Sequence, residues 1–250
     1  MREQAEQNKN AWEYRAYEMR TTKDPLHETA KEILDNPKRF LRYHQKYFTN
    51  IAGKRIANVC GSDGRRTIPF AVLGAEATLF DISEAQKKYA LELAEAVGVK
   101  LEYVIGDFIE TDIVKYGDKF DFVYLEGGIL HYFSDIDTFM KTLYAITKPG
   151  GQMILCDFHP YRKILFPELT DGDYFDSQLH YAEVPLRDFA PEEEQNEFPK
   201  ISMRLYTISE IINSVIDAGF ALKEFTEHNY KEYKDGKIPQ EFTIIADKTV

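Results

Sequence analysis

The residues best suited to chemistry in this chain form a glycine turn and an acid. An apolar run of β-type residues over 56–60 leads directly into a turn that carries Gly61 and Gly64. A second apolar run over 77–80 ends on Asp81. Glycine lets a backbone approach a ligand closely, and an acid placed this far beyond the turn can accept hydrogen bonds from the ribose hydroxyls of an adenosine. The pattern predicts the first βαβ unit of a nucleotide-binding sheet.

The turn also indicates which adenosine cofactor to expect. A dinucleotide site requires G-x-G-x-x-G, whose bare amides face a pyrophosphate. Here the spacing is G-x-x-G, and Asp63 lies inside the turn. A carboxylate repels a pyrophosphate but is compatible with the sulfonium and ammonium groups of S-adenosylmethionine (SAM). We therefore expect SAM as cofactor and S-adenosylhomocysteine (SAH) as product, and an NAD-dependent dehydrogenase is the weakest alternative.

Composition limits the class of protein. With 250 residues, of which 44% are hydrophobic, the chain is long enough for one sizeable core with an elaboration. A net charge of -11 argues against nucleic-acid and anionic-membrane partners. No apolar run approaches the roughly 20 residues of a membrane span, and residues 1–10 are too polar for a signal peptide. We expect a cytoplasmic protein, monomeric or homodimeric, with a small-molecule partner.

The two cysteines, Cys60 and Cys156, each end a predicted strand. If a further strand lies between them, they are about 9–10 Å apart, two strand spacings, which is too far for a disulfide. We expect both to be buried core thiols.

The elements that position the turn and the acid alternate between strand and helix. Strands are predicted at about 55–60, 76–81, 101–105, 120–125 and 152–157, and helices at about 64–74, 84–97 and 135–147. A helix at about 207–218 is followed by strands at 220–227 and 241–247, joined by a loop too short for a crossover helix. The order predicts an α/β fold: a seven-stranded, mostly parallel sheet with an antiparallel C-terminal strand and helices on both faces.

Fragments spread along the chain, in this order and spacing, resemble class I (Rossmann-like) SAM-dependent methyltransferases of the small-molecule type, from about Lys54 to the end. Asn58 stands at the acid of the first motif. Cys60, Ser62 and Gly64 stand at its three glycines, with Gly61 between the first two. The acid is thus an amide and two of the glycines are replaced, although the turn remains.

The other motifs of the resemblance fit better. Asp81 matches the ribose-binding acid, with Ile82 placed to cover an adenine face, and Asp107-Phe108 matches the adenine motif. Residues 121–132, which include Glu126 and Gly127, match strand four and its following turn, and residues 148–151 match the turn before strand five. For Glu126 the resemblance implies contact with the cofactor amino group or support of the loop.

The resemblance implies an enzyme that transfers a methyl group to oxygen or nitrogen of a small molecule by in-line displacement. Positioning supplies much of such catalysis, and a base is needed only if the nucleophile carries a proton. His131 and His159 are the candidate bases, since imidazole titrates near neutral pH. The structural alternatives are a helix-capping role for His131 and a backbone-bonded turn for His159, before Pro160.

The resemblance also divides the chain. Residues 1–50 are expected to form an N-terminal helical cap, broken by Asp24-Pro25 and Asn36-Pro37 into about three short helices. Its Arg42 or Tyr43 could reach the methionine carboxylate of SAM, or simply pack on a helix face. Residues 51–250 form the SAM-binding domain, in which the insertion 158–206 builds the substrate pocket.

Three alternatives stay open. A divalent metal could be imagined between Asp157 and Glu126, but no third oxygen donor stands at a recognisable spacing, so we expect no metal. The altered first motif also fits a non-catalytic SAM-binding or regulatory protein. Methylation of a macromolecule is the remaining alternative, against which the acidic charge of the chain argues.

Overall fold

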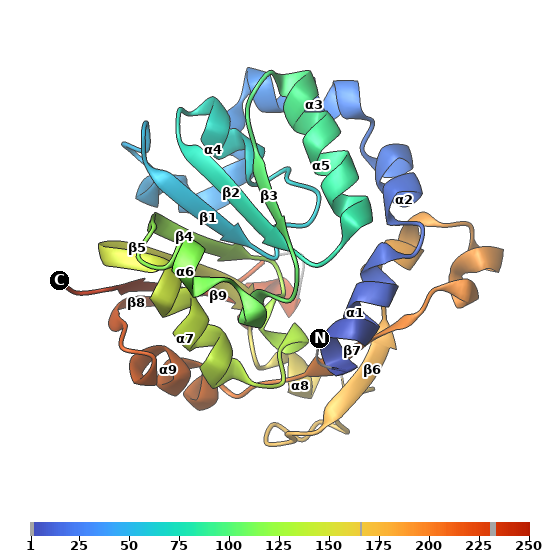
Figure 1. The fold of residues 1–250 in the computed structure, drawn as a ribbon. Coiled ribbons are helices and arrows are strands. Elements are labelled where there is room, and N and C mark those ends of the chain that lie inside the picture. The colour runs from blue at the N-terminus through green and yellow to red at the C-terminus, as the bar shows by residue number, and fades with distance from the viewer. Residues whose placement is uncertain (1–2, 166, 231–233) are drawn as a thin grey trace.

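A computed structural model describes residues 3–165, 167–230 and 234–250, and a seven-stranded sheet runs through its centre (Figure 1). The strands lie in the order β3-β2-β1-β4-β5-β9-β8. Their bounds are β1 Arg55–Val59, β2 Glu76–Asp81, β3 Glu102–Ile105, β4 Phe120–Glu126, β5 Thr147–Phe158, β8 Ala221–His228 and β9 Glu241–Asp247. Strands β1 to β5 pair in parallel, and β9 is antiparallel to both neighbours, β5 and β8. The predicted sheet is confirmed.

Helices cover both faces of this sheet, as predicted (Figure 1). On one face lie α6 (Ile113–Tyr116), α7 (Ile136–Ile146) and α9 (Ile208–Asp217). On the other lie α3 (Leu26–Asp35), α4 (Ile68–Val72), α5 (Glu84–Val97) and the 3-10 segment η1 (Pro37–Tyr47). A parallel sheet needs this double cover because its strands bury side chains on both sides. In β1, Ile56 packs towards η1 and Ala57 towards α7.

Local signals set some boundaries well and others poorly. Helix α5 has the predicted bounds: the Ser83 hydroxyl accepts a hydrogen bond from the Gln86 amide, and Gly98 ends the helix at φ +80°. The helix predicted at 64–74 is wrong in length, because the residues up to Thr67 form the turn and α4 begins only at Ile68. The predicted turn at 148–151 is instead part of β5, at a point where its register to β4 shifts.

The N-terminal residues form one helix more than the sequence suggests before η1. Helices α1 (Glu3–Glu13) and α2 (Ala16–Lys23) are separated at Arg15, whose φ is +50°. No proline or glycine marks this break in the sequence. The breaks at 24–25 and 36–37 fall where they were predicted, and the residues after the second form η1 rather than an α-helix.

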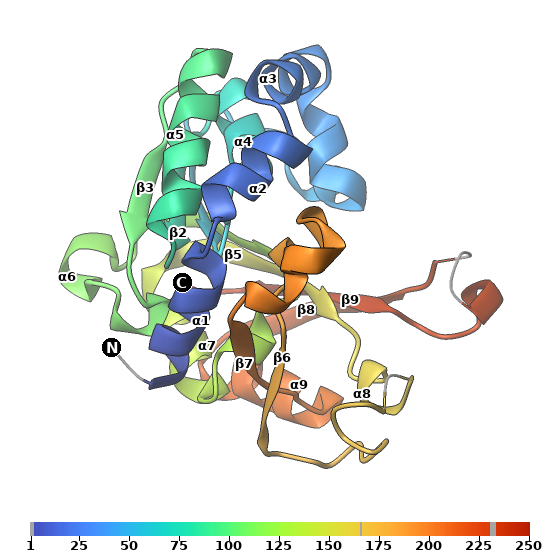
Figure 2. The same ribbon diagram turned by 90° about the vertical axis from the view of Figure 1, so that its right-hand side faces the viewer.

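The insertion packs against the N-terminal helices (Figure 2). It contains α8 (Arg162–Leu165), β6 (Leu179–Glu183), η4 (Pro185–Phe189), η5 (Glu192–Glu197) and β7 (Lys200–Arg204), with β6 and β7 paired antiparallel. The Asn8 side chain of α1 exchanges two hydrogen bonds with the backbone of Ser202, at 3.0 and 2.7 Å. Glu194, in the acidic run 192–194 of the insertion, forms a 2.6 Å ion pair with Arg15.

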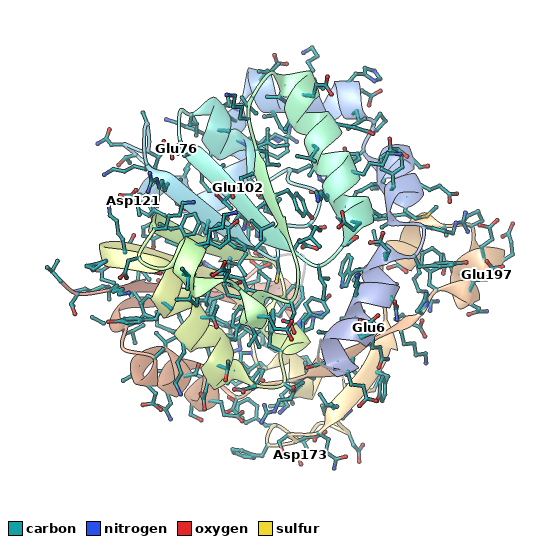
Figure 3. The ribbon with its side chains drawn as sticks, viewed as in Figure 1. Glu6, Glu76, Glu102, Asp121, Asp173 and Glu197 are labelled. Carbon is teal, nitrogen blue, oxygen red and sulfur yellow. The ribbon has the colours of Figure 1, made fainter. Side chains whose placement is uncertain are left out.

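Acidic residues are spread over the molecule (Figure 3). Glu76, Glu102 and Asp121 stand at the starts of β2, β3 and β4, and each pairs with a lysine or arginine. The other acids labelled in Figure 3 lie apart from these, on α1 and the insertion: Glu6, Asp173 and Glu197. The acids at the amino edge of the sheet are therefore paired with basic side chains, which makes this edge a charged surface. None of the described helices combines the length and apolarity needed to cross a membrane.

Candidate cofactor and active site

A cavity of about 590 Å³ lies at the carboxyl edge of the sheet. All but one of the predicted cofactor residues line it: Asn58, Cys60, Gly61, Ser62, Asp81, Ile82, Asp107, Phe108, Glu126 and Gly127. The exception is Gly64, which lies close to Ala90 of α5. Helix α1 closes one side through Gln4, Ala5, Asn8 and Trp12, and η1 contributes Arg39, Phe40 and Arg42. The N-terminal helices are thus part of the wall.

The turn after β1 keeps the backbone of a glycine-rich loop although two of the three motif glycines are replaced. Cys60 and Ser62 have φ of +53° and +50°, and Gly64 has +76°. Side chains are disfavoured in this region, so the chain accepts strain at the two replaced positions. At Gly61 a Cβ atom would lie 2.6 Å from Cγ of Leu79, which leaves room only for glycine. The shape of the turn is therefore retained although its sequence departs from the motif.

Asn58 serves the turn itself. Its Nδ2 donates to the carbonyl of Tyr124 on β4 at 3.0 Å, and its Oδ1 accepts from the Thr67 hydroxyl at 2.6 Å. The side chain thereby ties β1 to β4 and to the end of the turn. Both polar atoms of the amide are engaged by the protein.

Asp81 is held by backbone amides. Its Oδ1 accepts from Ile82 and Ser83 at 2.8 and 3.1 Å, and its Oδ2 accepts from Ser62 at 2.9 Å. Burial raises the pKa of Asp81 above its ordinary value, although these bonds oppose the rise. A carboxylate has about four acceptor sites, so about one remains, on Oδ2. Beside it, the buried Ser62 Oγ has no hydrogen-bond partner among the described residues.

Asp107 and Phe108 lie at the end of β3. The buried Asp107 accepts from the Ile109 amide at 3.2 Å and caps η2 (Phe108–Glu110). The ring of Phe108 packs edge-on to Phe80 in the core. Asp107 therefore has a fixed position in the cavity wall, and the Phe108 ring is committed to the core.

Asp63 requires a correction. Its carboxylate is buried and lies 3.0 Å from both Arg20 and Arg65, and Arg65 also pairs with Asp24. Burial favours the neutral acid, but the two guanidinium groups outweigh it and lower the pKa of Asp63. The sequence analysis took Asp63 to be an unpaired negative charge that faces the ligand. This is wrong, because Arg20 of α2 and Arg65 of the turn neutralise it.

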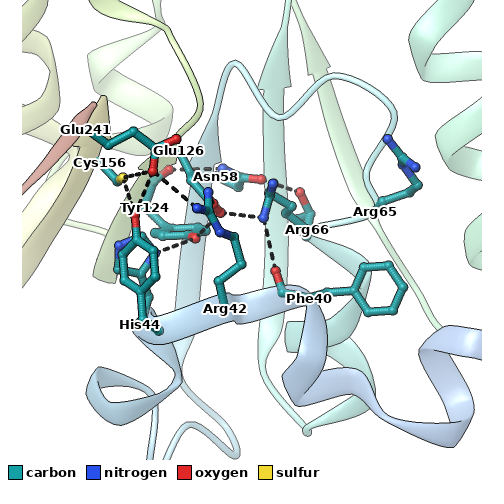
Figure 4. Close-up of polar contacts among 12 residues, drawn as sticks. Phe40, Arg42, His44, Asn58, Arg65, Arg66, Tyr124, Glu126, Cys156 and Glu241 are labelled. Atoms are coloured by element: carbon teal, nitrogen blue, oxygen red, sulfur yellow. Dashed lines mark hydrogen bonds and ion pairs between the residues drawn. The ribbon is translucent and has the colours of Figure 1, made fainter. Parts of the chain in front are cut away.

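Glu126 ends β4 between two arginines (Figure 4). Its Oε1 lies 2.7 Å from Nη1 of Arg42, and its Oε2 lies 2.7 Å from Nη1 of Arg66. The Tyr124 hydroxyl also donates to Oε2. Burial disfavours the charge of Arg42, but Glu126 and Glu241 together raise its pKa. The three charged side chains all line the cavity.

Behind Glu126 runs a chain of hydrogen bonds that the sequence analysis missed. Tyr124 donates to Glu126, so its oxygen accepts from His44 Nδ1 at 3.0 Å. His44 Nε2 then accepts from the Thr243 hydroxyl at 3.0 Å, and Thr243 accepts from His228 at 2.8 Å. Burial lowers the pKa of His44 to about 3 and keeps the ring neutral. Successive donors in such a chain strengthen one another, and all point towards the Glu126 carboxylate.

Neither candidate base lines the cavity. His131, in η3 (Leu130–Tyr132), lies parallel to the ring of Phe158, and burial with help from Arg162 lowers its pKa to about 3. His159 is fully buried: its Nδ1 accepts from the Tyr161 amide, so Nε2 carries the hydrogen and donates to Glu227 at 2.9 Å. His159 thus stabilises the turn at 159–161 through the bond from the Tyr161 amide. His131, with its lowered pKa, is a weak base.

The imagined metal ligands have other partners. Asp157 accepts from the amides of Ile129, Leu130 and Phe158, and burial raises its pKa to about 6. In the described part of the chain no group of three or more histidine, cysteine, aspartate or glutamate side chains is arranged to hold a metal ion. Cys60 and Cys156 are free, with β4 between their strands as expected, but only Cys156 is fully buried.

Comparisons with known proteins agree with this architecture. Residues 56–151 match the family described as a methyltransferase domain. A demethylmenaquinone methyltransferase of Streptomyces avermitilis is 31% identical over 108 residues, which cover 43% of this chain and 44% of that protein. The match thus spans less than half of its length.

Two solved structures share the fold. A SAM-dependent methyltransferase from Methanosarcina mazei superposes with a TM-score of 0.63 at 17% identity, covering 83% of this chain and 98% of its own. Magnesium protoporphyrin IX methyltransferase from Synechocystis, solved with bound SAH, gives 0.63 at 14% identity, covering 99% of this chain and 100% of its own.

The match of residues 56–151 to a methyltransferase domain and the fold shared with these structures support a class I, Rossmann-like SAM-dependent methyltransferase.

Proposed function

We propose that this chain transfers a methyl group from SAM to an oxygen or nitrogen atom of a small molecule by in-line displacement. The observation that carries the proposal is the gathering of the predicted cofactor residues around one cavity at the carboxyl edge of the sheet. Similarity to a demethylmenaquinone methyltransferase favours a small-molecule acceptor over a macromolecule. The net charge of -11 points the same way.

The donor set fits the proposed cofactor. The free acceptor site on Asp81 and the unpartnered hydroxyl of Ser62 suit the two ribose hydroxyls. Asp107 is proposed for the exocyclic amine of adenine, beside Ile82, and Glu126 for the ammonium group. An orphaned buried hydroxyl costs stability unless a ligand satisfies it, so Ser62 argues for a polar ligand here.

The bound cofactor supplies an electrophilic methyl group on a sulfonium. The chain holds the acceptor in line with that group and excludes water. Trp12 from α1 packs edge-on against Tyr132, with ring centroids 6.1 Å apart, and both line the cavity. Since neither histidine lines the cavity, the proposal assigns catalysis to positioning, which can supply several kcal/mol, rather than to a histidine base.

The first test is calorimetric titration of the chain with SAM, SAH and NAD. The proposal expects SAM and SAH to bind in the micromolar range and NAD not to bind. Transfer of a labelled methyl group from SAM is then measured to hydroxyl and amine acceptors, and separately to demethylmenaquinone, a quinone that carries neither group. Failure of SAM and SAH to bind would refute the proposal. Tight SAM binding without transfer to any acceptor would favour the non-catalytic alternative.

A further inference from the structure

Asp157, near the end of β5, holds the loop that follows β4. Its Oδ2 accepts hydrogen bonds from the amides of Ile129 and Leu130, both at 2.8 Å. These amides belong to a loop in which Gly127, Gly128 and Ile129 line the cavity. Asp157 itself is only 3% exposed and does not line the cavity. The carboxylate therefore reaches across from β5 and fixes the backbone of the cavity wall without touching the ligand.

The other oxygen of Asp157 fixes Phe158, which supports the same wall. Its Oδ1 accepts from the Phe158 amide at 2.6 Å. A Cβ atom on Gly128 would lie 2.3 Å from Cε2 of Phe158, so the ring rests directly on the backbone of Gly128. Gly128 lines the cavity and Phe158 does not. One carboxylate thus holds both the wall and the ring that packs behind it.

This arrangement depends on the charge of Asp157. An ionised carboxylate only accepts hydrogen bonds, whereas the protonated acid carries a donor of its own. Bonds from N–H groups to an ionised acceptor are roughly twice as strong as those to a neutral one. Protonation therefore weakens all three bonds together. Burial raises the pKa of Asp157 to about 6, although the three amides oppose the rise.

The titratable groups that face Asp157 from other elements are Glu241 of β9, Cys60 in the turn after β1 and Tyr132 of η3. The pKa of Glu241 is lowered by its hydrogen bonds and by Arg42, and burial raises those of Cys60 and Tyr132. These three groups therefore keep their charge states as Asp157 titrates.

We propose that Asp157, as an ionised carboxylate, is a positioning residue that holds residues 127–130 in the conformation in which the cavity binds SAM and SAH. Ligand binding and ionisation are then linked, because a ligand that needs this conformation favours the state that maintains it. SAH affinity is full above the pKa of Asp157 and falls as the pH is lowered through it. This inference rests on the proposed function, because it assumes that SAM and SAH bind in the cavity.

The first measurement needs no ligand. The backbone amide resonances of Ile129 and Leu130 are followed by NMR in the isotope-labelled full chain between about pH 5 and pH 8. Both are expected to move together with one midpoint near pH 6, because they donate to the same oxygen. In Asp157→Asn this common movement should disappear.

The second measurement is calorimetric titration with SAH at about pH 7.5 and about pH 5. At pH 5 only about a tenth of a group with a pKa of about 6 remains ionised, so SAH should bind the unmodified chain about tenfold more weakly there. In Asp157→Asn the single oxygen cannot accept all three amides, and SAH should bind roughly 5- to 50-fold more weakly at pH 7.5. Its affinity should then differ by less than about twofold between the two pH values.

Two variants serve as controls. Asp112→Asn makes the same change at an exposed aspartate that also accepts two backbone amides, from Val114 and Lys115 at 2.9 and 3.2 Å. Its SAH affinity should match that of the unmodified chain at both pH values. Asp81→Asn removes the proposed ribose acid and weakens SAH binding, but it should keep the tenfold dependence on pH because Asp157 is intact. Thermal unfolding at both pH values establishes that each variant is folded.

Several outcomes would overturn the assignment. Amide resonances of Ile129 and Leu130 that do not titrate together would show that Asp157 does not hold the loop through its charge. Equal SAH affinity at the two pH values in the unmodified chain would show that the ligand does not need that charge. A pH dependence that persists in Asp157→Asn and vanishes in Asp81→Asn would belong to the ribose acid.

In each of these cases SAH binding at pH 7.5 leaves the proposed function standing. If SAH bound at neither pH, the proposed function would fail and this inference with it, even if the amide resonances titrated as expected.

Discussion

Replacing Asp81 by asparagine tests the adenosine end of the cavity with little change of shape. In the folded chain the Asp81 carboxylate accepts three backbone amides, two on Oδ1 and one on Oδ2. Asparagine keeps one oxygen for Ile82 and Ser83. Its NH2 group, however, replaces Oδ2, so the Ser62 amide has no acceptor. The same NH2 group presents a donor to the ligand where the carboxylate presented an acceptor.

The magnitude follows from this geometry. The variant loses one charge-assisted acceptor for the ribose and disturbs the turn at Ser62, which together should weaken SAH binding by about 2–3 kcal/mol, or roughly 30- to 150-fold. The free energy of unfolding should fall by less, about 1 kcal/mol. Burial raises the pKa of Asp81 and so makes its charge costly, and the neutral amide avoids that cost.

The assay is calorimetric titration with SAH, alongside urea unfolding of the same preparations. Glu76→Gln is the matched control, because it makes the same change at the exposed opposite end of β2. Its SAH affinity should equal that of the unmodified chain. If Asp81→Asn bound SAH normally, the ribose would not lie at Asp81. If stability fell as far as affinity, Asp81 would be a structural residue of the turn.

Three further predictions concern the turn after β1, the chain of hydrogen bonds behind Glu126, and helix α1. Gly61→Ala should lower the free energy of unfolding by about 1–3 kcal/mol, because the new Cβ meets Leu79 at 2.6 Å; unchanged urea unfolding would show that the turn relaxes. Folding lowers the pKa of His44 from 6.5 to about 3, so the unfolded chain binds more protons than the folded chain between these pH values. The free energy of unfolding should therefore decrease as the pH is lowered through this range. His44→Gln should flatten that dependence in urea unfolding at pH 7 and pH 5, and an equally steep loss would exclude His44 as its source. Trp12, the single tryptophan, lines the cavity and contacts Tyr132, so SAH should change the tryptophan fluorescence; calorimetric binding without such a change would place the ligand away from α1.

Local patterns in the sequence were enough for most of the fold. Strands β2 and β9 and helix α5 have the predicted bounds, since alternating apolar runs, a serine cap and a terminal glycine act within a few residues of each other. The βαβ order and the short final loop then fix which strands are parallel. The predicted cofactor residues come together for the same reason: parallel strands end at one edge of the sheet.

What the sequence could not supply were interactions between distant segments. Nothing near Asp63 indicates that Arg20 would reach it from α2. The pairing of Arg42 with Glu126 spans 84 residues and depends on how η1 lies across β4. The same holds for His131 and His159, whose residue type suggested bases: burial lowers the pKa of His131 to about 3, and His159 is bonded to Tyr161 and Glu227 in a turn.

The sequence by itself therefore determined the class of fold, the edge of the sheet that carries the site, and the acids at the strand ends. Tertiary structure decided which charges are neutralised and which of the predicted side chains line the cavity. The physical reason is range. Strand, helix and cap preferences are set by near neighbours, whereas the charge state of a buried group depends on desolvation and on partners that only folding brings within about 3–4 Å.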